Sequence, residues 1–186
     1  MKKVLSILMV AMFATAVMSC SKDKDDESTL NIPDNTLVYD GTSYTFDEVV
    51  VDYYHQALTL VSAYTSEMQQ GTEDPMLAID GIHITPNMWN KTFDLTSQAS
   101  WPDEVSVYMI LNGVLDISFE GWVNGDRDIS GHIDDVDYEH ESIFTSGTYR
   151  VSGNNDGTPI TVTIDGVLKN GKKLQIKLVT DSYNVH

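Results

Sequence analysis

Oxygen-bearing side chains recur at a regular spacing between residues 126 and 137. They stand at positions 1, 3, 5, 9 and 12 of this segment, as Asp126, Asp128, Ser130, Asp134 and Asp137. Position 6 is Gly131, and position 7 is His132, which would offer its backbone carbonyl. Calcium is held by roughly six to eight oxygen ligands, and a glycine allows the chain to turn around the ion. The segment is therefore a candidate calcium loop.

This spacing resembles the calcium loop of EF-hand proteins, with two departures. Asp137 stands where that family has the longer glutamate, and the flanking segment 117–123 alternates like a strand rather than a helix. Ile129, Gly131 and Ile133 also alternate with polar residues. A half-exposed strand is thus the alternative interpretation, and we expect no cofactor, with calcium as the alternative.

Aromatic residues in predicted turns and irregular segments form a second candidate site. They are Tyr53, Tyr54, Trp89 and Trp101. Binding residues concentrate on the loops of β scaffolds, where aromatic faces can stack on sugar rings or anchor a protein partner. The alternative is that these side chains close the ends of the core.

Four lysines gather on one predicted hairpin: Lys169, Lys172, Lys173 and Lys177. They could face anionic head groups or a partner. The alternative is that they are edge-strand lysines, which keep sheets from associating edge to edge. His83, His132 and His140 are scattered along the chain, and we interpret them as surface or capping residues.

Sequence motifs for catalysis are missing. The chain has no G-x-S-x-G, no H-E-x-x-H and no phosphate-binding loop. We therefore expect a protein that is not an enzyme. The alternative is a small hydrolase that cleaves an envelope polymer with a pair of carboxylates, because the 28 acidic residues offer many such pairs.

The spacing of glycines predicts the elements that must position these residues. Seven of the 12 glycines follow Asn or Asp, namely Gly41, Gly81, Gly113, Gly125, Gly157, Gly166 and Gly171. Asn-Gly and Asp-Gly between alternating apolar runs are typical of tight β-hairpins. Gly166 lies inside one such run and suggests a β-bulge.

Several alternating runs are joined in this way. We expect hairpins that pair 37–39 with 44–46, 49–51 with 58–61, 105–111 with 115–123 and 160–168 with 174–178, and short strands at 76–79 and 82–85 on either side of Asp80-Gly81. The fold class predicted is an all-β antiparallel sandwich of successive hairpins. The alternative is an up-and-down barrel of the lipocalin kind.

The N-terminus reads as an export signal. Lys2 and Lys3 precede an apolar run over 4–18 that is too short for a comfortable bilayer span. The run ends in Val17-Met18-Ser19-Cys20, which contains the single cysteine of the chain. These residues resemble the lipobox of bacterial lipoproteins, and the resemblance implies that Cys20 is lipidated after removal of a signal peptide over 1–19. The alternative is an ordinary signal peptide.

An acidic, polar stretch follows Cys20. Residues 21–28 contain no apolar side chain, so we expect a solvated tether over 20–30 and a single β domain over 31–186. The tether resembles the export signals of Bacteroidota surface lipoproteins. That resemblance implies a lipid-anchored protein of the outer membrane on the cell surface, with a periplasm-facing domain as the alternative.

The charge of the chain limits its partners. Without residues 1–19 the chain has 28 acidic and 9 basic residues, because two of the 11 basic residues are removed, and its net charge is −19. This charge argues against binding nucleic acid and against docking the whole domain on anionic lipid. We therefore expect a membrane-anchored, non-catalytic binding or accessory module whose partner is a glycan or a protein.

Overall fold

The structure is a computed structural model in which all regular elements are β-strands apart from one short turn. It describes residues 30–54, 58–68, 70, 74–82, 84–95, 105–111, 117–123, 129–133, 136–138, 143–154, 156 and 158–186. This part of the chain contains fourteen strands and a 3₁₀ turn, η1 (Pro86–Met88). None of its helical residues forms a segment with the length and apolarity needed to cross a membrane.

Six strands form the first sheet, in the order β2-β1-β13-β12-β11-β6. Their bounds are β1 (Thr36–Tyr39), β2 (Thr42–Thr45), β6 (Thr92–Asp94), β11 (Phe144–Ser152), β12 (Ile160–Leu168) and β13 (Lys173–Thr180). All neighbouring pairs in it are antiparallel. The N-terminal hairpin therefore lies beside a strand that is more than a hundred residues away in the sequence.

Eight strands form the second sheet, in the order β10-β9-β8-β7-β5-β4-β3-β14. Their bounds are β3 (Glu48–Tyr54), β4 (Leu58–Tyr64), β5 (Leu77–Ile82), β7 (Val105–Leu111), β8 (Ile117–Val123), β9 (Ile129–Ile133), β10 (Val136–Tyr138) and β14 (Tyr183–Val185). The pairing is antiparallel except at one edge, where β14 runs parallel to β3.

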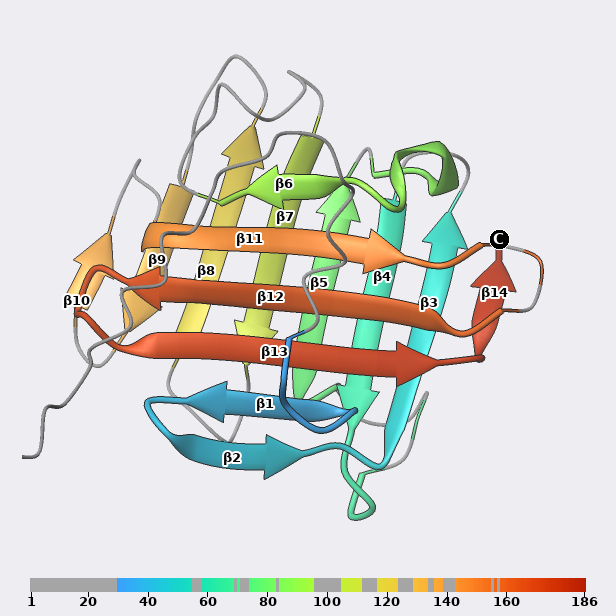
Figure 1. The fold of residues 1–186 in the computed structure, drawn as a ribbon, viewed down its shortest axis with the longest axis horizontal. Coiled ribbons are helices and arrows are strands. Elements are labelled where there is room, and N and C mark those ends of the chain that lie inside the picture. The colour runs from blue at the N-terminus through green and yellow to red at the C-terminus, as the bar shows by residue number, and fades with distance from the viewer. Residues whose placement is uncertain are drawn as a thin grey trace, which may run out of the picture.

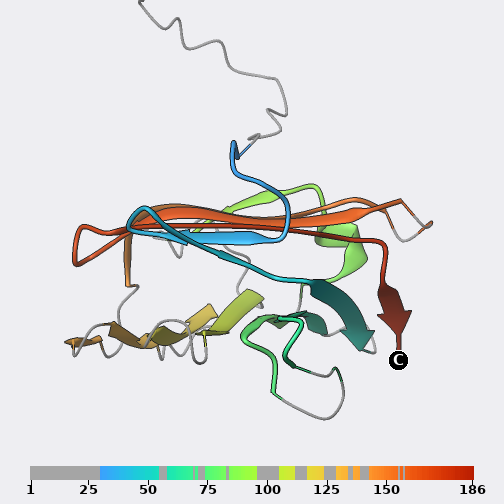
Figure 2. The same cartoon turned by 90° about the horizontal axis from the view of Figure 1, so that it is seen from below.

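The two sheets lie face to face as two separate layers (Figure 2). The strands of the first run across those of the second, as in orthogonal sheet packing (Figure 1). Each sheet keeps two edge strands, β2 and β6 in one and β10 and β14 in the other. The predicted all-β sandwich is confirmed, and the barrel alternative is wrong, because the sheets do not close on themselves.

The core fills the space between the inner faces. In β12 and β13 the side chains alternate between buried and half-buried, as expected for strands with one face in a core. In the eight-stranded sheet, a fully buried row crosses four strands, made of Val51, Val61, Ile79 and Met109. Because the chain has a single cysteine, no intrachain disulfide joins the layers, and they are held by non-covalent contacts.

The predicted hairpins are largely confirmed. β1 and β2 pair around Asp40 and Gly41, whose φ angles of 47° and 83° are those of a tight hairpin turn. β3 pairs with β4, β7 with β8, and β12 with β13. The succession of hairpins is interrupted by β6, which pairs with β11 in the other sheet. As a result, β5 pairs with β7.

The Asp80-Gly81 step is not a break between strands, and that prediction is wrong. β5 runs without interruption from Leu77 to Ile82. Gly81 serves a different purpose, since a Cβ atom there would lie 3.0 Å from the side chain of Ile84, which is fully buried. The missing side chain at Gly81 therefore leaves room for Ile84 in the core.

The bulge predicted at Gly166 lies on the opposite strand. The register between β11 and β12 shifts between Phe144 and Ser146, whereas Gly166 pairs regularly with Gly147. The Phe144 ring packs directly over Gly166, where an added Cβ would stand 2.6 Å from a ring carbon. A close side-chain approach, rather than an extra residue, explains this glycine.

The lysine hairpin is not at a sheet edge. Lys173 and Lys177 belong to β13, which lies between β1 and β12 in the interior of the six-stranded sheet. The edge-strand interpretation is therefore wrong. Lys173 forms an ion pair with Asp165 at 3.4 Å, and the Lys172 ammonium lies 5.1 Å from the centre of the Tyr39 ring.

Replacing Gly166 by alanine is expected to destabilise the domain. Either the Phe144 ring or the Ser146 carbonyl, 2.9 Å from the new Cβ, must move. Overpacking of this kind costs about 1–3 kcal/mol. Urea unfolding of Gly166→Ala measures the loss. In a Phe144→Leu background the same change should cost less, because the two sites are coupled. A Gly166→Ala protein as stable as the native one would contradict this packing.

Candidate functional site

Only part of the candidate calcium loop lies among the described residues. Ser130 is in β9 and Asp137 is in β10, while Asp126, Asp128 and Asp134 lie outside the described residues. β9 and β10 pair in antiparallel register, with Asp137 opposite His132. The strand interpretation is thus correct for 129–133. Calcium binding stays a prediction, and the described part of the chain holds no group of three or more acidic, His or Cys side chains suited to a metal.

The candidate aromatic residues do not form one site. Tyr53 and Trp89 are buried, with 9% and 4% of their surface exposed, so they do not offer the accessible aromatic faces expected of binding residues. Trp89 packs edge-on against Tyr183, with ring centroids 5.6 Å apart. Trp89 belongs to the core cluster, as the alternative interpretation predicted for these side chains. Trp101 lies outside the described residues, as does Cys20.

The backbone holds Trp89 in this position. Asn90, with a φ of 65°, donates its backbone N–H to the Val151 carbonyl at 2.7 Å. Its side-chain amide exchanges two hydrogen bonds of 3.0 Å with the backbone of Gly153. Among the described residues, the indole Nε1 of Trp89 and the hydroxyl of Tyr149 have no hydrogen-bond partner. Burial, and then the nearby Asp80 carboxylate, raise the pKa of the Tyr149 hydroxyl, so it stays neutral inside the core.

Tyr54 is the one predicted aromatic residue that belongs to an accessible cluster. Its ring stacks on the His186 imidazole, with centroids 4.5 Å apart and planes 13° from parallel. The tyrosine is half-buried and the histidine side chain is 45% exposed. Burial, and then the Asp52 carboxylate, raise the pKa of the Tyr54 hydroxyl. The phenol is therefore a neutral hydrogen-bonding group at physiological pH.

Asp52 joins this pair to the last strand. Its Oδ1 accepts a hydrogen bond of 2.9 Å from the Asn184 side-chain amide and lies 2.9 Å from Nε2 of His186. Because a carboxylate only accepts, Nε2 carries the hydrogen, and Nδ1 of a neutral ring is left as an acceptor. Tyr54, His186, Asp52 and Asn184, which we call the β3–β14 site, thus combine an aromatic stack with fixed donors and acceptors.

Strand register places this cluster on the outer face of its sheet. Asn184 pairs with Asp52, whereas the neighbouring Val51 and Val61 point into the core. His186 is held next to Tyr54 by a backbone hydrogen bond of 2.9 Å from its N–H to the Tyr53 carbonyl. Residues two apart on a strand share a face, so Asp52 and Tyr54 lie side by side away from the core.

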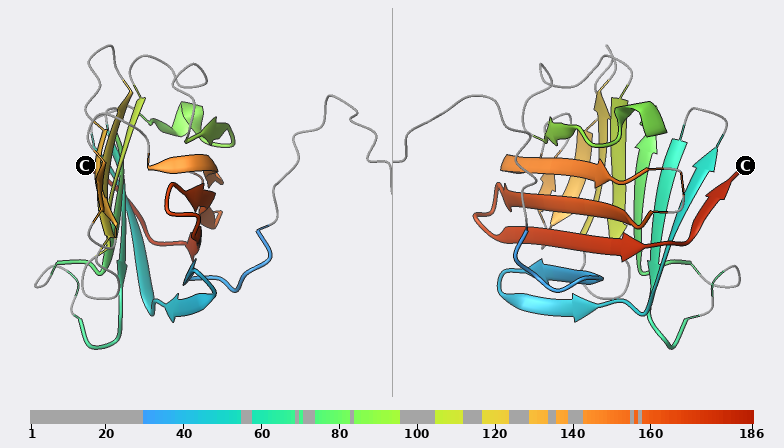
Figure 3. Two further views of the ribbon diagram at one scale, coloured as in Figure 1. Left: turned by 90° about the vertical axis from the view of Figure 1, so that its left-hand side faces the viewer. Right: turned by 45° about the vertical axis from the view of Figure 1, so that its right-hand side comes forward.

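The same face continues across the sheet. Cross-strand pairing aligns Asp52 with Leu60, Leu60 with Asp80, Asp80 with Tyr108 and Tyr108 with Glu120. Residues paired in this way share one face. Among the described residues, no strand or helix lies across this face (Figures 2 and 3), although Val50, Ser62 and Tyr64 on it are buried. The face therefore carries two acids, Asp52 and Asp80, in one register-defined row beside Tyr54.

Asp80 is the unusual member of this row. Its Oδ1 is buried and, in the described structure, lacks a hydrogen-bond partner. Burial raises the pKa of this carboxyl above its ordinary value of 3.8. A carboxylate without donors is costly to bury, because nothing replaces the water that it loses. The neutral acid is therefore favoured relative to an exposed aspartate.

No family model, curated protein or solved structure matches the chain. The fold class, a two-sheet all-β sandwich, consequently rests on the strand pairing of this protein itself.

Asp80→Asn is expected to raise stability at neutral pH. The folded-state pKa of Asp80 lies above 3.8, so the folded protein holds this proton more tightly than the unfolded chain. The favourable contribution is complete below pH 3.8 and is lost as the pH rises through the raised pKa. Urea unfolding from acid to neutral pH should show the native protein losing stability relative to Asp80→Asn. Asp181→Asn, at an exposed position, is the control. Parallel pH profiles for the native protein and Asp80→Asn would contradict the prediction.

Proposed function

We propose that this protein is a non-catalytic binding module, attached to the outer membrane through a lipid on Cys20, that binds a glycan at the β3–β14 site. The proposal places the domain on the cell surface, as the acidic tether suggests. It joins two independent features of the chain. The lipobox-like residues support the anchor, and the outer face of the eight-stranded sheet supports the binding role.

The observation that carries the binding role is the stacked pair of Tyr54 and His186 above the hydrogen-bonded Asp52. A sugar ring presents an apolar C–H face, which packs on aromatic rings, and a rim of hydroxyls, which need both donors and acceptors. The β3–β14 site supplies the Tyr54 ring for the first requirement. It supplies Asp52 and Asn184, which are joined at 2.9 Å, for the second.

These groups are largely preorganised, which lowers the entropy lost on binding. Asp52 has only 16% of its side chain exposed and is held by two neighbours, so its orientation is set before a ligand arrives. His186 lies parallel to Tyr54, 13° between the planes. A ligand would therefore meet a rigid, mainly polar surface rather than one that must be ordered.

One feature favours a second candidate, a carboxylate-based hydrolase that acts on an envelope polymer. Asp52 and Asp80 share a row and are separated by one strand, a backbone distance of about 10 Å. Inverting glycosidases hold their carboxyls about 6.5–9.5 Å apart and need one acid with a raised pKa, and the pKa of Asp80 is raised. Against this role, Oδ1 of Asp80 is buried, so the acid would reach a substrate poorly.

Binding at this site is tested with a glycan array of envelope and plant polysaccharides, followed by calorimetry on the best ligand. Tyr54→Ala should weaken binding about two- to tenfold, because an aromatic contact contributes about 0.5–1.5 kcal/mol. Tyr54→Phe keeps the ring and should bind within a few-fold of the native protein. Thr163→Ala, on the other sheet, is the matched control for a surface change.

Three outcomes separate the candidates. Retention of a glycan whose affinity Tyr54→Ala lowers, while Tyr54→Phe does not, supports the binding module. Release of new reducing ends during incubation, lost in Asp80→Asn, supports the hydrolase instead. An array on which no glycan is retained, or binding that Tyr54→Ala leaves unchanged, contradicts the proposed site and leaves a protein partner as the target.

The anchor is tested separately. Cys20→Ala is expected to leave the membrane fraction or to remain unprocessed, because it cannot carry a lipid. Ser21→Ala, the neighbouring residue, should remain membrane-bound and serves as the control. Fractionation followed by mass spectrometry of the mature protein measures both. Unchanged retention and mass in Cys20→Ala would contradict lipidation.

A further inference from the structure

We propose that the outer face of the six-stranded sheet lies toward the membrane surface, so that the outer face of the eight-stranded sheet, with the β3–β14 site, points away from it. This inference rests on the lipid anchor of the proposed function. It concerns a second surface, however, and the occupant proposed for that surface is the membrane that holds the Cys20 lipid.

The first observation is the point at which the tether reaches the domain. The segment from Leu30 to Asp34 lies on the outer side of the six-stranded sheet, opposite the second sheet (Figure 2). Leu30 is already buried, with 7% of its surface exposed. The chain therefore arrives at the domain from the side away from the β3–β14 site.

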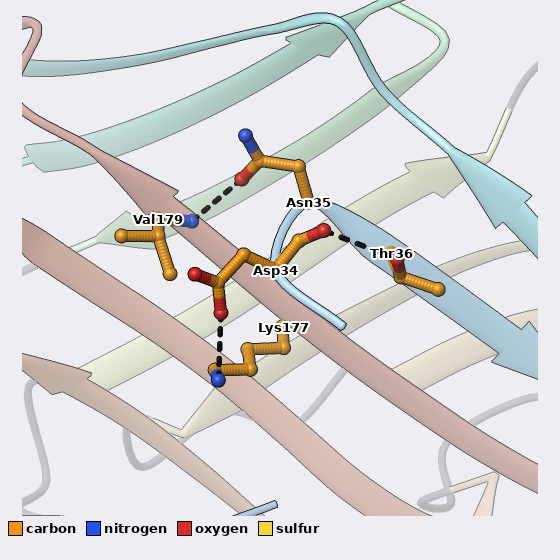
Figure 4. A network of polar contacts seen from close by, with 5 residues as sticks. All are labelled: Asp34, Asn35, Thr36, Lys177 and Val179. Carbon is orange, nitrogen blue, oxygen red and sulfur yellow. Dashed lines mark hydrogen bonds and ion pairs between the residues drawn. The ribbon is translucent and has the colours of Figure 1, made fainter. Parts of the chain in front are cut away.

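Side-chain contacts fix this arrival point (Figure 4). The Asp34 carboxylate and the Lys177 ammonium form an ion pair of 2.7 Å. The Asn35 side-chain oxygen accepts the Val179 N–H at 2.7 Å, next to the position where Thr36 begins the backbone ladder with Lys177. The Thr36 hydroxyl donates to the Asp34 carbonyl at 3.1 Å. These contacts hold 34–36 on β13, an interior strand of the sheet.

The second observation is the short reach of the chain between the anchor and this point. Cys20 and Leu30 are ten residues apart. Ten residues span at most about 35 Å, even when fully extended. A domain of this size has a radius of gyration of about 15 Å. To bring the eight-stranded sheet against the membrane, the tether would have to run around the rim almost fully stretched.

The third observation is the distribution of charge between the sheets. The eight strands that include β3 and β14 contain no Lys or Arg and five acids, which are Glu48, Asp52, Asp80, Glu120 and Asp137. The six strands of the other sheet contain three basic residues and two acids, which are Arg150, Lys173, Lys177, Asp94 and Asp165. The strand charges are thus −5 and +1.

An anionic membrane surface repels the more acidic sheet within about a Debye length, roughly 10 Å. The six-stranded sheet carries no such penalty, since its lysines balance its acids. Lys173 is paired with Asp165, and Lys177 with Asp34. The tether and the charge therefore both favour the six-stranded sheet as the side that faces the membrane. The β3–β14 site then faces away from the membrane, where large ligands can reach it.

The orientation is tested on the full, lipidated chain in vesicles of phosphatidylethanolamine and phosphatidylglycerol. Cys20 is the only cysteine and its sulfur carries the lipid in the proposal, so an introduced cysteine can be labelled alone. Thr163→Cys places a dye on the outer face of the six-stranded sheet, and Leu60→Cys places it on that of the eight-stranded sheet. Energy transfer to a head-group acceptor reports the distance of each dye from the membrane.

We expect transfer from Thr163→Cys to exceed that from Leu60→Cys several-fold. Inserting about 20 Gly-Ser residues after Ser28 should remove most of this difference, because the longer tether frees the domain to turn. Equal transfer from the two positions, or stronger transfer from Leu60→Cys, would overturn the orientation while leaving anchor and glycan binding intact. Failure of the chain to float with the vesicles would instead overturn the anchor, and the orientation with it.

Discussion

The architecture depends on keeping two crossed sheets face to face without a covalent link. Cys20 is the only cysteine, so the layers are held by the buried inner rows and by the points at which the chain passes between them. One such point joins β13 to β14. There the Thr180 hydroxyl donates to the Val49 carbonyl at 2.6 Å, which ties the last long strand of one sheet to the first strand of the other. This hydrogen bond helps to position β14, which follows Thr180.

The position of the candidate site depends on this passage of the chain from β13 to β14. After Thr180 the chain turns, the Ser182 carbonyl accepts the Val51 N–H at 3.0 Å, and β14 adds to the sheet in parallel to β3. Parallel pairing brings Asn184 next to Asp52 and His186 next to Tyr54. A slip of one residue would exchange the two faces of β14 and would send the polar side chains toward the core. The side-chain contacts of the site therefore depend on this register between β14 and β3.

The outer faces of the two sheets differ in the charged and aromatic residues that they carry. One receives the start of the domain and balances its charges in pairs, as with Lys177 and Asp34 at 2.7 Å. The other carries Asp52, Tyr54 and the half-buried Asp80, whose Oδ1 is buried without a hydrogen-bond partner among the described residues. Carboxyls with a raised pKa are enriched at functional sites, although structural networks also contain them. This difference between the faces is the basis for the proposal that the domain is anchored on one side and binds on the other.

The all-β fold class could be predicted from the sequence, because the period-two alternation of apolar residues and turns such as Asp40-Gly41 are local signals. Tyr54 was also a candidate from the sequence, but it was grouped with Tyr53 and Trp89, which are buried. The choice between a sandwich and a barrel, the interior position of β13, and the contacts of Asp52 with Asn184 and His186 required the folded structure. Those residues are more than a hundred positions apart, and pairing between distant strands depends on the packing of the whole chain rather than on any local pattern.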